Sequence, residues 1–274
     1  MTVVLAAAAL HAGWNTLVKS RGDKLVASAL VCFGAAIAGA PLLFFLAAPL
    51  PESIPYIIMS GIVHGFYFTF LGLAYQNADL SVVYPITRGT APIMTTCVAA
   101  LWIGEWLSPF AAAGVLVLSA GILWLSVDGL RRGGLHFDAL VLALSNAFVV
   151  ASYSLIDGMG GRLSGHPFSY NAWAGIAGAA CFAPFLLWYR GREFFVEMRA
   201  GWRFGLLGGA MALTAYGIAI WAMTQAPIGM VAALRETSVI FGSVFAAFIL
   251  HERFGRARWA AAALVVAGVV LMRL

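Results

Sequence analysis

Apolar residues occur along this chain in long runs that short polar breaks separate. Each run is about 18 to 24 residues long, the length that a helix needs to cross a hydrocarbon core of about 30 Å. The pattern therefore predicts an all-α polytopic membrane protein with ten transmembrane helices. We predict these spans at residues 2–18, 25–47, 54–76, 81–102, 109–127, 137–157, 169–188, 202–225, 230–250 and 256–272.

The composition agrees with lipid as the main solvent. Of 274 residues, 62% are hydrophobic and 10% are charged, which lies far from the averages of soluble domains. The first run carries His11 and Asn15 where a signal peptide stays apolar, so we interpret it as a helix. The longest connection, at residues 190–201, leaves no room for a soluble catalytic domain.

Basic residues are distributed unevenly over the connections. Twelve Lys and Arg lie after the first, fifth, seventh and ninth spans, whereas the opposite side holds Arg162 and Arg273. Because cytoplasmic connections are rich in basic residues, the asymmetry places both termini outside. It also explains the net charge of +5 without a nucleic-acid partner. The twelve residues are Lys19, Arg21, Lys24, Arg131, Arg132, Arg190, Arg192, Arg199, Arg203, Arg253, Arg256 and Arg258.

Neither the cysteines nor any catalytic motif indicates an enzyme. Cys32, Cys97 and Cys181 fall within apolar spans without metal-ligand spacing, so we predict that they are buried apolar side chains. The sequence has no HExxH, no GxSxG, no nucleotide-binding glycine loop and no Asp-rich cluster. We therefore predict no cofactor, no metal and no enzymatic activity.

The second half of the chain repeats the first at a constant offset of 147 residues. The offset pairs Arg88 with Arg235 and Glu105 with Glu252, so that arginine and glutamate are 17 residues apart in both copies. We interpret residues 1–130 and 131–274 as two five-helix repeats. Because five is odd, the second repeat enters the membrane in the opposite sense, as in many secondary transporters.

Several short motifs accompany this repeat. They are HAGWN in the first span, AYQNADLSVVYPITRGTAP around the start of the fourth, GE before the fifth and HE before the tenth. With these motifs the full chain resembles the EamA-type drug/metabolite transporter superfamily. The resemblance implies two inverted five-helix bundles around a central cavity and the export of amino acids or other small metabolites. Among better-known members, the chain resembles in kind the bacterial aromatic amino acid exporters. The resemblance therefore implies a bacterial inner membrane location, in which the termini lie on the periplasmic side.

The first span carries a polar stripe. His11, Asn15 and Lys19 recur every four residues and share one helix face, with Trp14 beside them. Polar groups within a bilayer must face protein or water, so we expect the stripe to point into the bundle. Two interpretations stay open for His11, Trp14 and Asn15: contact with the substrate, or hydrogen bonds that hold helices together. Lys19 is expected to reach the cytoplasmic surface.

The third and fourth spans add further candidates. His64, Tyr67 and Tyr84 could line a cavity, and Arg88 lies between two prolines that disturb the helical backbone. The planar guanidinium of Arg88 suits a carboxylate of the substrate. The alternative is a structural arginine, because Arg235 occupies the equivalent place in the second copy.

The second half carries one acidic residue well inside a span, Glu236. Its neighbour Arg235 points about 100° away on a helix, so we expect the two to have different partners. Glu236 either belongs to a buried ion-pair network or titrates during transport.

Aromatic and polar residues also line the sixth and eighth spans. Asn146, Tyr153 and Asp157 form a one-sided stripe, and Tyr153 and Tyr216 are candidates for substrate contact. Such a cavity would suit apolar or aromatic amino acids.

Two further features are predicted to be structural. Glu105 and Glu252 precede helix starts, where a carboxylate accepts backbone N–H groups. Gly61 with Gly65, and Gly205 with Gly209, have the spacing of close helix contacts.

The sequence thus favours a secondary transporter that exports amino acids or related metabolites by alternating access. The alternative is a polytopic membrane enzyme that acts on a lipid or an isoprenoid. The expected partners are the bilayer and a small-molecule substrate, and a monomer is compatible with the sequence.

Overall fold

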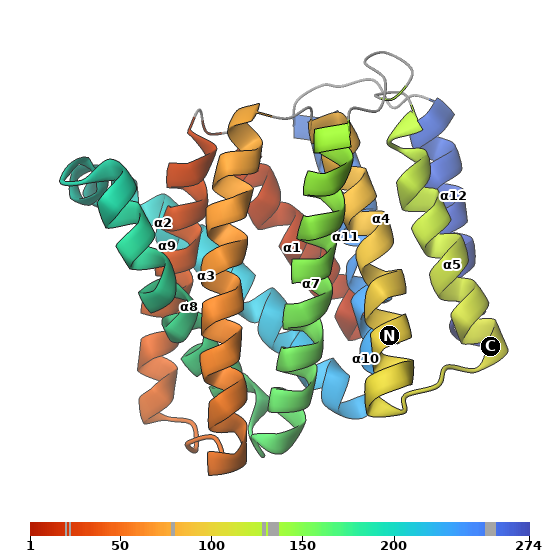
Figure 1. The fold of residues 1–274 in the computed structure, drawn as a ribbon, viewed down its shortest axis with the longest axis horizontal. Helices are drawn as coiled ribbons and strands as arrows, with labels where there is room; N and C mark the ends of the chain where they lie inside the picture. The colour runs from red at the N-terminus through yellow and green to blue at the C-terminus, as the bar shows by residue number, and fades with distance from the viewer. Residues whose placement is uncertain (20, 22, 78–79, 128–129, 131–136, 250–255) are drawn as a thin grey trace. The chain divides into compact units, whose positions relative to one another are not determined.

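A computed structural model of the chain describes residues 1–19, 21, 23–77, 80–127, 130, 137–249 and 256–274 (Figure 1). Over these residues the regular structure is helical, and no strand occurs. The helices are α1 (Thr2–Lys19), α2 (Lys24–Gly39), η1 (Ala40–Phe44), η2 (Pro51–Ser53), α3 (Ile54–Asn77), α4 (Leu80–Val98), η3 (Ala99–Ile103), α5 (Pro109–Trp124), α7 (Phe137–Leu163), α8 (Pro167–Arg190), α9 (Glu193–Gln225), α10 (Ile228–Arg235), α11 (Ser238–Ile249) and α12 (Arg256–Leu271).

Several of these helices have the length and composition of membrane spans. Within the described residues, four segments are long and apolar enough to cross a bilayer, and shorter apolar helices accompany them. The all-α, membrane-protein character is therefore confirmed, whereas the number of ten spans stays a prediction. The four segments are Lys24–Phe44, Phe137–Leu163, Pro167–Arg190 and Glu193–Gln225, and the shorter helices are Thr2–Val18, Pro109–Trp124 and Ala257–Leu271.

Two predicted connections are wrong because helices occupy them. The segment 190–201 is not a long loop: α8 ends at Arg190, Gly191 caps it with a φ of 57° that favours glycine, and α9 begins at Glu193. A carboxylate in the first turn complements the helix dipole, so α9 starts well before its apolar stretch. Similarly, α7 continues beyond the predicted end at Asp157 as far as Leu163.

The predicted continuous helix at 230–250 is also wrong. α10 ends at Arg235, α11 begins at Ser238, and Glu236 and Thr237 form a turn between them. The N–H of Glu236 donates to the carbonyl of Ala233 at 3.0 Å, and the hydroxyl of Thr237 donates to the carbonyl of Leu234 at 2.7 Å. The backbone bond from Glu236 closes over three residues instead of four, which tightens the chain between α10 and α11.

The chain forms two compact units that each draw on both halves of the sequence. Unit 1 consists of Met1–Ala12, Ala74–Leu155 and Ala226–Leu274, and unit 2 consists of Gly13–Leu73 and Ile156–Gln225. The repeat boundary near residue 130 is placed from the sequence, and the two compact units do not follow it. The division into two five-helix repeats stays a prediction.

Glycines allow close helix packing in unit 1. A Cβ on Gly121 of α5 would lie 3.0 Å from the carbonyl oxygen of Ala261, and one on Gly268 of α12 would lie 2.6 Å from that of Gly114. Gly121 and Gly268 are 147 residues apart, the offset of the sequence repeat. Both copies therefore use the same glycine at the contact between α5 and α12.

The same principle holds in unit 2. A Cβ on Gly205 of α9 would lie 2.6 Å from the carbonyl oxygen of Leu30, and one on Gly209 would lie 2.1 Å from the backbone nitrogen of Ala35 on α2. On α3, Cβ atoms at Gly61 and Gly65 would lie 2.7 Å and 2.9 Å from the Cβ atoms of Ala177 and Cys181 on α8. The predicted packing role of these glycines is confirmed.

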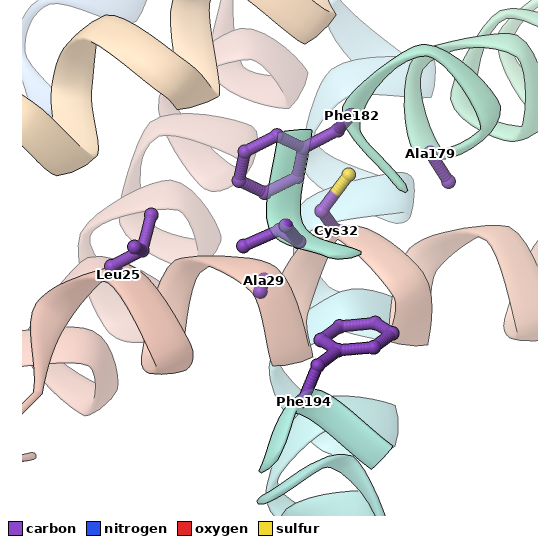
Figure 2. Close-up of a cluster of buried hydrophobic side chains, with 7 residues drawn as sticks. Leu25, Ala29, Cys32, Ala179, Phe182 and Phe194 are labelled. Atoms are coloured by element: carbon purple, nitrogen blue, oxygen red, sulfur yellow. The ribbon is translucent and has the colours of Figure 1, made fainter. Parts of the chain in front are cut away.

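An apolar cluster joins α2, α8 and α9 in unit 2 (Figure 2). Cys32 is buried there beside Phe182 and Phe194, as predicted. The prediction of burial is wrong for Cys97 and Cys181, which are exposed. An unpaired thiol behaves as a small apolar group, so it is tolerated on an apolar outer face as well as in a core.

Candidate functional site

An ion pair is buried within unit 1. Nη1 of Arg88, on α4, lies 3.2 Å from both carboxylate oxygens of Glu236, in the turn between α10 and α11. Each side chain is 4% exposed. Taking two charges out of water is costly, and the pairing offsets much of that cost only while both partners are present. Glu236 therefore takes part in a buried ion pair, which is one of the two roles that the sequence leaves open for it.

His11 and Tyr84 complete the surroundings of the guanidinium. Nη2 of Arg88 lies 3.1 Å from Nε2 of His11 on α1. Because a guanidinium can only donate, His11 accepts through Nε2 and is neutral in this arrangement. The Cζ atom of Arg88 lies 5.3 Å from the centre of the Tyr84 ring, one helical turn earlier on α4, which is a cation–π distance.

The sequence of α4 explains how Arg88 is held. Pro92 has no N–H to donate to the carbonyl of Arg88, so the regular bonding of α4 is interrupted at this residue. The hydroxyl of Thr87 donates to the carbonyl of Ala143 on α7 at 3.0 Å. Gly89 lets α4 approach α5, since a Cβ there would lie 2.6 Å from Leu123.

Glu105 positions α10, and through it Glu236. Its Oε2 accepts the backbone N–H of Ile228, the first residue of α10, at 2.8 Å. The expected role, acceptance of N–H groups at a helix start, is confirmed, but the expected helix is wrong. Ser108 caps α5 instead, by accepting the N–H of Ala111 at 3.1 Å. Glu252, its predicted counterpart, lies outside the described residues.

A second polar cluster lies within unit 2. Asp157 of α7 is completely buried, and its Oδ1 accepts the hydroxyl of Tyr170 of α8 at 2.9 Å. Its Oδ2 accepts the hydroxyl of Tyr216 of α9. The ring of Tyr216 contacts that of His64 of α3 edge-on, with 5.7 Å between centroids. The Nδ1 atom of His64 lies 3.0 Å from the carbonyl oxygen of Ser60.

The structure therefore gathers six of the ten predicted site residues into two groups. His11, Tyr84, Arg88 and Glu236 are in contact in unit 1, and His64 and Tyr216 are in contact in unit 2. That these residues bind a substrate stays a prediction.

The other four predicted residues have different surroundings. Trp14 packs in an apolar cluster of unit 2 with Val18 and Val31, and Asn15 follows it, half-buried, on α1. The ring of Tyr67 contacts that of Phe68 at 5.3 Å, and Tyr153 is buried on α7.

Sequence reasoning did not select two members of the second cluster. Asp157 lies on the predicted polar stripe of α7, and an acidic residue inside an apolar segment is a signal that could have identified it. Tyr170 gives no such signal, because a tyrosine near the start of an apolar helix is typical of a membrane interface.

Comparison with known proteins agrees with this architecture. The sequence profile of the EamA-like transporter family matches residues 138–274. A solved structure described only as "Crystal structure of protein" aligns with 100% of this chain and 97% of its own, with a TM-score of 0.74 and 18% sequence identity. At that identity the likeness shows a shared fold.

Proposed function

Because the chain belongs to the EamA-like transporter family, we propose that it is a secondary transporter that exports amino acids or related small metabolites by alternating access. The family consists of membrane transporters of small metabolites, so a multi-pass membrane protein with a small-molecule substrate is the premise of this proposal. A membrane enzyme acting on a lipid or isoprenoid is not favoured, because the family comprises transporters.

The observation that carries the amino acid proposal is the buried pair of Arg88 and Glu236. A zwitterionic amino acid has one carboxylate and one ammonium group, which are the charge complements of these two side chains. The substrate carboxylate can take the place of Glu236 on Arg88 while its ammonium group pairs with Glu236. Both buried charges then stay paired. Leaving either of them unpaired would cost about 3–5 kcal/mol. A ligand with only one of the two charges lacks this compensation.

The ring of Tyr84, which lies beside the guanidinium, supplies an apolar and polarisable wall at the same place. This favours substrates with apolar or aromatic side chains. We further propose that Trp14, Asn15, His64, Tyr67, Tyr153 and Tyr216 contact the substrate in at least one state of the transport cycle.

The repeat in the sequence supports alternating access. Arg88 belongs to the first copy and Glu236 to the second, so a substrate that separates them acts on both copies at once. Two equivalent arrangements of inverted repeats can open a site to one side and then to the other. The export direction rests on the resemblance of the motifs. The charge asymmetry supports an orientation with both termini outside, and the resemblance of the motifs supports a bacterial inner membrane location.

The test is counterflow in proteoliposomes over a panel of amino acids. For each active amino acid, the matching amine without the carboxylate and the matching acid without the ammonium group serve as controls. We expect saturable exchange of the zwitterion and at least about tenfold weaker exchange of either analogue, because each leaves one buried charge uncompensated. A flux that rises linearly with concentration would instead indicate a pore, and equal exchange of all three ligands would exclude recognition by the pair.

A further inference from the structure

The completely buried Asp157 is bound by two phenols. Its two oxygens accept the hydroxyls of Tyr170 and Tyr216, from two different helices. In the described part of the chain, no Lys, Arg or His forms an ion pair with it. A buried carboxylate without a cation is costly to keep ionised, so a proton is the ligand that relieves this cost with the least rearrangement.

We propose that Asp157 is the proton-binding site that couples substrate export to proton entry. This inference rests on the proposed transport function, because coupling requires a transported substrate. It assigns the role to Asp157 instead of Glu236. Protonation of Glu236 would leave the buried guanidinium of Arg88 without its counter-charge. Protonation of Asp157 instead removes a negative charge that has no cationic partner among the described residues.

The two phenols can satisfy Asp157 in both protonation states. A phenolic hydroxyl is both a donor and an acceptor. When Asp157 is ionised, both tyrosines donate to it. When one proton adds to Oδ1, the new O–H donates to the oxygen of Tyr170, while Oδ2 still accepts from Tyr216. The change forms one O–H bond and needs no oxidant or other reactant.

Polar side chains lead from Asp157 to a less buried residue. The ring of Tyr216, whose hydroxyl donates to Asp157, contacts the ring of His64 edge-on, and Ser60 Oγ lies 3.2 Å from Nδ1 of His64. His64 is half-buried, so it forms the more accessible end of this group of side chains, whose buried end is Asp157.

The titratable groups around Asp157 come from all of the packed helices. From α3 these are Tyr56, which packs against the cluster around Tyr170, and His64, whose ring contacts Tyr216. On α7 itself, Arg162 directs its Nε to the carbonyl of Met223 at 2.8 Å. Among the described residues, both groups that hydrogen-bond to Asp157 are therefore phenols, and the imidazole of His64 contacts one of them.

A glycine makes the arrangement possible. Gly160 follows Asp157 by three residues on the same face of α7, and a Cβ there would lie 2.5 Å from the hydroxyl oxygen of Tyr170. Any larger residue would push the Tyr170 ring away from the carboxylate. The glycine is therefore a requirement of the hydrogen bond between Tyr170 and Asp157.

The test compares Asp157→Asn with Asp138→Asn, the same chemical change at an exposed position on the same helix. In proteoliposomes, one pH unit across the membrane should drive about tenfold substrate accumulation if one proton moves per substrate. We expect this accumulation in the wild type and in Asp138→Asn. In Asp157→Asn we expect a loss of accumulation far larger than any loss of counterflow. Wild-type accumulation in Asp157→Asn, or accumulation driven by sodium instead of protons, would overturn the inference.

A second measurement does not require transport. Infrared difference titration of the purified protein should show the carbonyl band of one buried carboxylic acid, which Asp157→Asn removes and Asp138→Asn retains. Tyr170→Phe deletes one hydrogen-bond partner of the carboxyl group, so the frequency of the band should shift. A band unchanged in both Asp157→Asn and Tyr170→Phe would overturn the inference. A band that behaves as expected in a protein without counterflow would refute the transport proposal alone.

Discussion

The carboxylate of Glu105 accepts the backbone N–H of Ile228 at 2.8 Å, which ties the segment after η3 to the start of α10. The two residues are 123 positions apart in the chain. Because α10 is only eight residues long and is followed directly by Glu236, the hydrogen bond at its first residue constrains the position of the buried carboxylate at its far end.

We expect Glu105→Ala to destabilise the protein by about 0.5–2 kcal/mol, the usual cost of removing a helix cap. Glu105→Gln keeps an amide oxygen as acceptor, so its effect should be smaller. The midpoint of thermal unfolding in detergent measures this difference. Glu52→Ala, at an exposed carboxylate of η2, is the control. A midpoint of Glu105→Ala equal to that of Glu52→Ala would show that the cap contributes nothing.

The contact between α2 and α9 gives a second prediction. A Cβ on Gly34 would lie 1.9 Å from the carbonyl oxygen of Gly205, so Gly34→Ala forces two backbones apart. Overpacking of this kind costs about 1–3 kcal/mol. At Gly175 of α8 nothing lies within 4 Å of an added Cβ, and Gly175→Ala should raise stability by up to about 1 kcal/mol through helix propensity. The midpoints of thermal unfolding of the two variants should therefore shift in opposite directions. A shift in the same direction would contradict the close contact between α2 and α9 at Gly34.

Much of the helical structure is predictable because hydropathy and helix length are local properties. The span expected at 54–76 is α3 at Ile54–Asn77, and that expected at 256–272 is α12 at Arg256–Leu271. The break between α10 and α11 has no such signal, since neither proline nor glycine lies at Glu236 or Thr237. The turn places Glu236 against Arg88, a contact 148 residues away in sequence that no local pattern contains.

The candidate sites show the same limit. Burial of a charge inside an apolar segment is visible in the sequence, and it identified Arg88 and Glu236 individually. Their pairing depends on tertiary structure. The sequence predicts that Glu236 points away from its neighbour Arg235, but it does not predict that Arg88 is the partner of Glu236. Tyr170 is a partner of Asp157 only because Gly160 lets its ring lie against α7.

Variants of the buried ion pair separate its structural role from substrate recognition. Arg88→Met or Glu236→Met alone leaves one buried charge uncompensated, and we expect each to lower stability by about 3–5 kcal/mol. The double variant removes both charges, so much of the stability should return, with a coupling energy of up to about 3 kcal/mol. Unfolding of the four proteins in detergent gives this cycle.

Counterflow by the same four proteins gives the functional half of that test. The double variant should stay inactive toward amino acids, because both ligands of the zwitterion are gone. Recovery of transport together with stability would mean that the pair serves the fold alone.

The role of His11 can be decided by the chemistry of its replacement. The amide oxygen of glutamine can accept from Nη2 of Arg88 as the imidazole does, whereas phenylalanine fills the space without an acceptor. A hydrogen bond to a charged group contributes about 1.5–3 kcal/mol, so His11→Phe should raise the KM of counterflow about 10- to 100-fold, while His11→Gln should stay near the wild type. His166→Gln, at an exposed position, is the control.

If His11 only joins helices, His11→Phe should lower the unfolding midpoint and leave KM unchanged in the folded fraction. An increase of KM at an unchanged unfolding midpoint would instead mean that His11 orients the guanidinium of Arg88 for the substrate.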